Sequence, residues 1–122
     1  MIAPGNVRAT ERVLKRCAKA ALANGKVLIF GEFEGADIHG NSGVCVLGAY
    51  NAYCYNLSCR GEKLHLPDDS DAMAEAWDSI EMGWDGVPHR KARTQTGRPV
   101  VKRWWSMGYR LRKTLKPTRA AR

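Results

Sequence analysis

The sequence contains no apolar run approaching the roughly 20 residues that a transmembrane helix needs. Its first residues, MIAPGNVRATE, also lack the apolar core of a secretory signal peptide. We therefore expect a cytoplasmic protein with no membrane partner. Cysteine is scarce as well, and its spacing matches no usual disulfide framework, so we expect reduced thiols at Cys17, Cys45, Cys54 and Cys59.

Motifs of catalysis and of nucleotide binding are also missing. The sequence has no phosphate-cradling glycine loop, no zincin motif and no nucleophile elbow. The spacing of a dinucleotide fingerprint is not met by Gly31, Gly35, Gly40 and Gly43. Nothing in the sequence ties a histidine to a particular cysteine, as thiol catalysis requires. We expect a protein that is not an enzyme and that uses no cofactor.

A zinc site is the chemical alternative that the sequence leaves open. Four soft ligands could come from Cys45, Cys54, Cys59 and His65. Their spacing is not that of a well-defined finger or ribbon, and cysteine is commonly buried as a small apolar residue. We therefore predict no metal site.

Acidic residues are absent from the last third of the chain. Twelve Lys or Arg and no Asp or Glu lie between Gly86 and Arg122, whereas eight acids and the single Lys63 lie between Glu62 and Asp85. Basic tails often serve only solubility. Here the cations alternate with Trp104, Trp105 and Tyr109, a mixture that can neutralise phosphates and stack on bases.

The N-terminal half predicts a helix followed by a small sheet. Thr10 can cap a helix that ends at Gly25, with a basic face of Arg12, Lys15, Arg16 and Lys19 that is either solvated surface or a second nucleic-acid contact. Residues 26–33 favour a strand, and residues 34–42 a loop. Residues 43–57 begin as a second strand that pairs with the first and continue as either strand or helix, and we favour a hairpin or small sheet.

The C-terminal half predicts two helices that pack on each other. Asp69 or Ser70 caps the first, which ends at Gly86 and Pro88. Its apolar stripe consists of Met73, Trp77, Ile80 and Trp84. The second runs from Pro99 to Leu115, with Pro99 in its first turn and a stripe of Val101, Trp104, Gly108, Leu111 and Leu115. The intervening residues 89–98 are too polar and basic to be buried.

These elements predict an α+β fold: an N-terminal helix, a short antiparallel β element, and a C-terminal helix pair joined by a basic loop. With 122 residues, of which 44% are hydrophobic, the chain is long enough for one small domain with a modest core. We expect residues 1–122 to form that domain, with residues 1–8 and 117–122 flexible.

The helix pair resembles ribosome modulation factor and similar small phage and plasmid proteins. The resemblance covers about a third of the chain and is carried by Gly83, Trp84 and Gly86 in the first helix and by Trp105, Gly108 and Tyr109 in the second. In that family the connection usually contains Cys-Pro or Asn-Pro, whereas this chain has Arg98 and Pro99. The resemblance implies binding to ribosomal RNA near the decoding region. In physical terms, Gly83 and Gly108 would let two helices approach closely.

We therefore expect a non-catalytic protein that binds RNA or the ribosome through its basic, tryptophan-containing C-terminal helix and loop. The candidate nucleic-acid-binding residues are Arg90, Lys91, Arg93, Arg98, Lys102, Arg103, Trp104, Trp105, Arg110, Arg112 and Lys113. The alternative is a phage-type accessory protein that inhibits a host protein, with Trp104 or Trp105 as the buried anchor. The sequence leaves the identity of the partner and the oligomeric state open.

Overall fold

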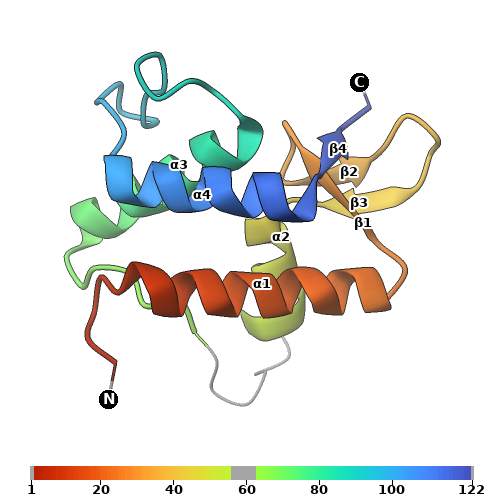
Figure 1. Ribbon diagram of the computed structural model, residues 1–122, viewed down its shortest axis with the longest axis horizontal. Coiled ribbons are helices and arrows are strands. Elements are labelled where there is room, and N and C mark those ends of the chain that lie inside the picture. Colours follow the sequence, from red (N-terminus) through yellow and green to blue (C-terminus); the bar gives the residue numbers. More distant parts are fainter. Residues whose placement is uncertain (1, 56–62, 122) are drawn as a thin grey trace. The chain divides into compact units, whose positions relative to one another are not determined.

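The computed structural model describes residues 2–55 and 63–121 and has an α+β fold (Figure 1). In chain order its elements are α1 (Val7–Ala23), β1 (Val27–Phe30), β2 (Glu34–Ala36), β3 (Ser42–Val44), α2 (Val46–Tyr50), a π-helical turn (Asn51–Tyr55), α3 (Ser70–Asp85), α4 (Lys102–Leu115) and β4 (Thr118–Arg119). Among the described helices, none has the length and apolar character that crossing a membrane requires.

The chain forms two compact units. The helical unit combines Met1–Glu11 with His65–Thr114, and so contains α3, α4 and the basic loop between them. The sheet unit combines Arg12–Leu64 with Leu115–Arg122, and so contains the four strands and α2. Helix α1 begins in the helical unit and continues in the sheet unit.

Helix α1 begins earlier than the sequence predicts. The side-chain Oδ1 of Asn6 accepts a hydrogen bond from Ala9 N–H at 2.9 Å, so Asn6 is the N-cap and the prediction of Thr10 is wrong. Thr10 is fully buried, and its hydroxyl accepts from His65 N–H at 3.1 Å. That partner lies far away in sequence, which explains why local sequence does not distinguish the two caps. The predicted end at Gly25 is confirmed, with φ +82°.

The four strands form a mixed sheet in the order β2-β3-β1-β4. The predicted pairing of the first strand with the strand after Ser42 is confirmed, but it is parallel, with Val27 opposite Gly43. The segment predicted as a loop contains β2, which pairs with β3 as the antiparallel part of the sheet. The two strands are joined through Asp37, whose buried carboxylate accepts from the N–H groups of His39 and Asn41, each at 2.9 Å.

The C-terminal segment predicted to be flexible is paired with the sheet. Strand β4 lies parallel to β1, and Ala120 N–H donates to Phe30 O at 3.0 Å. Ala120 is buried. The described residues after β3 are helical, so the favoured hairpin or small sheet is wrong there and the helical alternative holds. Cys45 caps α2, its Sγ accepting from Gly48 N–H at 3.3 Å. Residues 56 and 57 lie outside the described part of the chain.

Two glycines let α3 and α4 pack backbone to backbone, as predicted. A Cβ on Gly108 would collide with the carbonyl oxygen of Ile80, and a Cβ on Gly83 would lie 2.8 Å from Tyr109 N and would collide with the carbonyl oxygen of Trp105. Close approach of the helices therefore depends on both glycines.

The buried face of α3 differs from the predicted stripe. Ile80 and Trp84 are fully buried, but Met73 is 41% exposed and Trp77 is only half-buried. The remaining buried positions are small residues, namely Ala76, Ser79 and Gly83. Small residues are needed there because the backbone of α4 lies so close. The facing residues of α4 are Trp104, Met107, Gly108 and Leu111.

The boundaries of α3 agree with the sequence, and one boundary of α4 does not. Asp69 Oδ1 accepts from Ala72 N–H at 3.0 Å, and Gly86 ends α3 with φ +78°. Helix α4 starts only at Lys102. Pro99 lies before it, bridged to Arg93 in a short antiparallel contact, so its predicted place in the first turn is wrong.

Candidate nucleic-acid interface

The basic loop between α3 and α4 is folded back on itself. Thr94 N–H donates to Arg98 O at 2.8 Å, and Arg98 N–H donates to the Thr94 hydroxyl at 3.2 Å. Gly97, with φ +83°, makes the turn. Ala92 and Thr94 are buried, so the prediction that nothing in this loop would be buried is wrong at these two positions. The hydrogen bonds between Thr94 and Arg98 fix the backbone of the loop, and its exposed side chains project from that backbone.

Two contacts attach the loop to α3. Gln95 N–H donates to Asp78 Oδ2 at 3.0 Å. Arg98 Nη1 lies 3.3 Å from Glu75 Oε1, although the Arg98 side chain remains 69% exposed. The acidic helix therefore fixes the loop without covering it.

Eight of the eleven candidate residues are exposed cations. They are Arg90, Lys91, Arg93, Arg98, Lys102, Arg103, Arg110 and Lys113. Lys102 and Lys113 lie on the outward face of α4, three helical turns apart, with Tyr109 between them. Exposed cations on a fixed loop and on one helix face can approach a phosphate backbone together.

Arginines within this set also hold the fold together. Arg110 Nη2 lies 2.9 Å from Glu11 Oε1, and its side chain is still 51% exposed. Arg93 Nη1 donates to the carbonyl oxygens of Arg90 and Ala92, at 3.0 and 2.8 Å. Arg110 and Arg93 can thus reach a phosphate only by sharing or releasing these partners.

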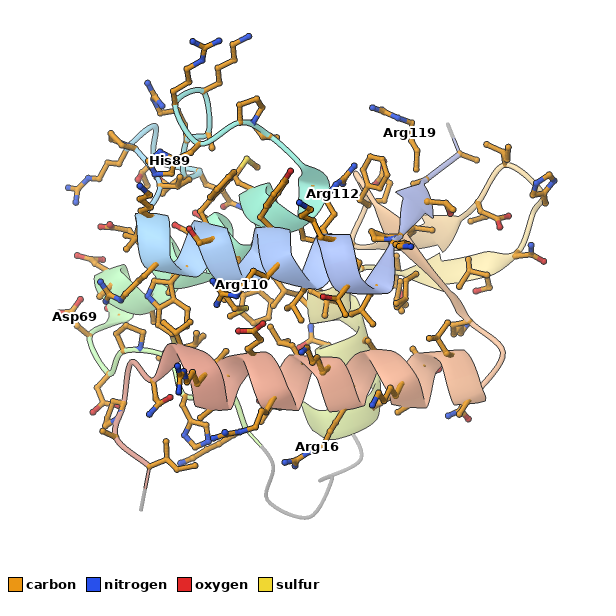
Figure 2. The ribbon with its side chains drawn as sticks, in the orientation of Figure 1. Arg16, Asp69, His89, Arg110, Arg112 and Arg119 are labelled. Atoms are coloured by element: carbon orange, nitrogen blue, oxygen red, sulfur yellow. The ribbon has the colours of Figure 1, made fainter. Side chains whose placement is uncertain are left out.

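Arg112 has a structural position and differs from the other predicted cations. It is half-buried, and its Nη1 donates to Trp84 O at 2.8 Å, at the end of α3 (Figure 2). A Cβ on Gly86 would lie 2.7 Å from its Cζ, so the guanidinium packs directly on that glycine. Arg112 closes the C-terminus of α3, where a cation is favoured by the helix dipole.

The two tryptophans of the predicted site do not offer open stacking faces. Trp104 is 1% exposed and belongs to the core, so its prediction as a nucleic-acid contact is wrong. Trp105 is half-buried, and its Nε1–H donates to Val87 O at 2.9 Å. The ring of Trp105 stacks on Tyr109 with centroids 5.2 Å apart, and His89 meets it edge-on at 5.4 Å.

Tyr109 and His89 are members of the surface that the list of candidate residues omits. Tyr109 is 36% exposed and carries Lys113 Nζ 5.6 Å from its ring centroid. The spacing of Trp105 and Tyr109, four residues on one helix, could have indicated their contact. His89 lies at the start of the loop (Figure 2). Its buried Nε2 has no hydrogen-bond partner in the described structure. Its contact with Trp105 could not be read from sequence.

The acidic side of α3 gives the helical unit a charge asymmetry. Asp78 and Glu81 line, with Met82, Arg93, Thr94 and Gln95, a shallow pocket of about 280 Å³. Burial, followed by repulsion from Asp85 and Asp78, raises the pKa of Glu81. Carboxylates crowded in this way repel a polyanion. The loop and the outward face of α4 are the parts of the helical unit that would attract one.

The possible zinc ligands are only partly described. Cys45 is buried and already caps α2, and the backbone N–H of His65 is bonded to Thr10. Cys59 and the side chain of Cys54 lie outside the described residues. Within the described residues no group of three metal-ligating side chains comes together.

Comparison with protein-family models, curated proteins and solved structures gave no match. The resemblance to ribosome modulation factor therefore stays a prediction.

Proposed function

We propose that this protein binds RNA without catalysing a reaction, either as isolated RNA or within the ribosome. The phosphate-binding surface would consist of the basic loop and the outward face of α4. The observation that carries the proposal is the group of eight exposed cations in a segment, residues 86–122, that contains no acid. Each phosphate that such a cation neutralises releases counterions, which is the main source of sequence-independent affinity.

Three of these cations are the best placed for phosphate contact. In the described structure Arg98 and Arg110 form ion pairs, and Arg93 donates to the carbonyl oxygens of its own loop. The Arg103 guanidinium lies 5.8 Å from the centroid of the Trp104 ring, whereas the exposed side chains of Arg90, Lys91 and Lys102 make none of these contacts in the described structure. A phosphate near them displaces no internal partner.

Base stacking has a smaller part in this proposal than the sequence suggests. Trp104 is in the core, and Trp105 is held between His89 and Tyr109. Tyr109, at the exposed end of this row, is the aromatic ring that a base could contact. Lys113 lies against the same ring and would have to move toward a phosphate as a base approached.

A charge variant tests the phosphate contacts. Replacing Arg90, Lys91 and Lys102 by glutamine should flatten the slope of log affinity against log salt by about 2 units, since each phosphate contact contributes about 0.7 to 0.9. The probe is single-stranded oligouridylate. The matched control replaces Lys63, Lys116 and Arg119, which are also exposed, by glutamine. Both variants lower the net charge from +8 to +5.

The control separates local contact from overall charge. An equal change in both variants would mean that the loop and α4 contribute only net charge. If the Arg90/Lys91/Lys102 variant bound RNA and ribosomes as the parent does, RNA would not be the ligand of this surface. A pull-down from lysate with and without nuclease would identify the cellular partner.

Binding to a host protein is the second candidate, and one observation favours it. Ile38 is 77% exposed at the tip of the β2–β3 turn, where Asp37 fixes the backbone through His39 and Asn41. A rigid turn that presents an apolar side chain can insert it into a pocket of a partner. In this second candidate function, Ile38 takes the role of anchor that the sequence predicts for Trp104 or Trp105, because Trp104 is buried and Trp105 is half-buried. Ile38→Asp should abolish capture of such a partner and leave RNA binding unchanged.

A further inference from the structure

Three aromatic side chains of the helical unit form a row that holds the ring of Tyr109 in place. The Nε1–H of Trp105 donates to Val87 O at 2.9 Å, and the ring of His89, labelled in Figure 2, meets Trp105 edge-on with centroids 5.4 Å apart. The ring of Tyr109 is nearly parallel to that of Trp105, with 7° between their planes and 5.2 Å between their centroids. The segment after α3 therefore holds Trp105, and Trp105 sets the orientation of Tyr109.

One face of the Tyr109 ring is covered by a lysine. Trp105, Tyr109 and Lys113 occur at steps of four residues along α4, so Trp105 and Lys113 approach the Tyr109 ring from opposite sides. Lys113 Nζ lies 5.6 Å from the ring centroid, and both residues are exposed. A contact of this kind at an exposed site contributes about 2- to 5-fold to an equilibrium, whereas a base stacked on an aromatic ring contributes about 5- to 150-fold in affinity. A base can therefore displace the lysine.

The order of charge and ring along α4 favours a single strand over a duplex. Lys102, Tyr109 and Lys113 lie on the outward face, so the ring is placed between two cations. The bases of a duplex are paired and stacked on one another, so a ring in a row of phosphate-binding cations meets no free base face. In a single strand, a base and its neighbouring phosphates can lie along the same line.

We propose that the ligand of the outward face of α4 is single-stranded RNA, with one unpaired base stacked on Tyr109. Lys113 then leaves the ring and contacts a phosphate next to that base. This inference rests on the proposed function and names the class of RNA that the surface selects. Because the row of rings is in place before binding, little conformational freedom is lost when the base stacks.

The test uses the full chain and two probes with the same number of phosphates, namely single-stranded oligouridylate and an oligomer of abasic nucleotides. The parent should bind oligouridylate at least about 5-fold more tightly, because only this probe carries bases. Tyr109→Leu should remove this preference and keep the salt slope, and Tyr109→Phe, which restores the ring, should restore the preference. The matched control is Phe33→Leu, which should keep the preference. Phe33 is 38% exposed, close to the 36% of Tyr109, and lies in the sheet unit.

Two further measurements separate the parts of the inference. Affinity for double-stranded RNA of the same length should be equal in Tyr109→Leu and the parent, because its bases are already paired. Lys113→Gln should flatten the salt slope for oligouridylate by about 0.7, the contribution of one phosphate of a single strand. An unchanged slope would show that Lys113 stays on the ring. An equal loss of affinity for both RNAs in Tyr109→Leu would show that the ring contacts no base, and either result contradicts the inference.

Failure of this inference can be distinguished from failure of the proposed function. If the parent binds the abasic oligomer and oligouridylate equally while the Arg90/Lys91/Lys102 variant flattens the salt slope, base stacking is refuted and the proposed function stands. If that charge variant matches its Lys63/Lys116/Arg119 control, RNA binding by this surface is refuted as well. The comparison of the two probes needs no variant, so it decides the question even if Tyr109→Leu does not fold.

Discussion

Gly108→Ala should separate the two helices that carry the proposed RNA surface. The added methyl would collide with the carbonyl oxygen of Ile80 and would lie 3.0 Å from its carbonyl carbon and 3.1 Å from its Cα. All three are backbone atoms of α3, so no side-chain rotation can make room. The helices must move apart or bend.

The expected loss of stability is the difference between two opposing terms. Overpacking a well-filled contact costs about 1–3 kcal/mol, and a contact with backbone atoms belongs at the upper end of that range. Alanine is a better helix former than glycine by about 0.8–1.0 kcal/mol. The net destabilisation should therefore be about 1–2 kcal/mol.

Tryptophan fluorescence during urea unfolding measures this loss in the relevant unit. All four tryptophans, at positions 77, 84, 104 and 105, lie in the helical unit, so their emission reports on that unit alone. Ser106→Ala on the same helix is the control, because it improves helix propensity without adding volume beside α3. If Gly108→Ala were as stable as the parent or more stable, the reasoning from close approach would be refuted.

Three further substitutions test packing, capping and charge. Trp84→Ala should destabilise the helical unit by about 3–5 kcal/mol and Trp77→Ala by clearly less, since Trp84 is fully buried and Trp77 is half-buried; equal losses in urea unfolding would contradict the assignment. Asn6→Ala should cost about 1 kcal/mol through loss of the cap of α1, whereas Asn24→Ala, beyond the last residue of that helix, should cost less in thermal unfolding by circular dichroism. Glu81→Gln should stabilise the protein at pH 7. Burial and the neighbouring Asp85 and Asp78 raise the pKa of Glu81, so its ionised form opposes folding above that pKa. The gain should shrink as the pH falls through the raised pKa and vanish below the unfolded value of about 4.3; an equal gain at pH 7 and pH 4 would rule this out.

The features that sequence predicted correctly depend on neighbours along the chain. Gly25 and Gly86 end their helices because glycine adopts positive φ easily, and Asp69 caps α3 from its own backbone. The contact at Gly83 and Gly108 was also predicted, since a residue without a side chain lets the backbone of another helix approach closely.

The features that sequence missed depend on distant partners. Asn6 and Thr10 are both suitable caps, and the choice between them is linked to a bond from His65 to Thr10. Strands β2 and β4 have three and two residues, too few for any alternation of apolar and polar positions to show. The sequence placed Trp104 both in the packing stripe of the second helix and among the nucleic-acid contacts, and only its place in the packing stripe agrees with the structure.

The sequence predicted that all candidate cations contact nucleic acid in the same way. In the structure, some of these cations also contact groups of the protein itself. In the described structure, the candidate cations that contact carboxylates or carbonyl oxygens through their side chains are the arginines Arg93, Arg98, Arg110 and Arg112. Their planar guanidinium groups present several donors in a fixed geometry, which suits such contacts, whereas a lysine ammonium is a compact and strongly hydrated charge. A count of basic residues therefore overestimates the charge available to RNA. The acidic segment that precedes the basic one takes up part of that charge to fix the loop and α4, and the cations left in solvent are held on a rigid frame.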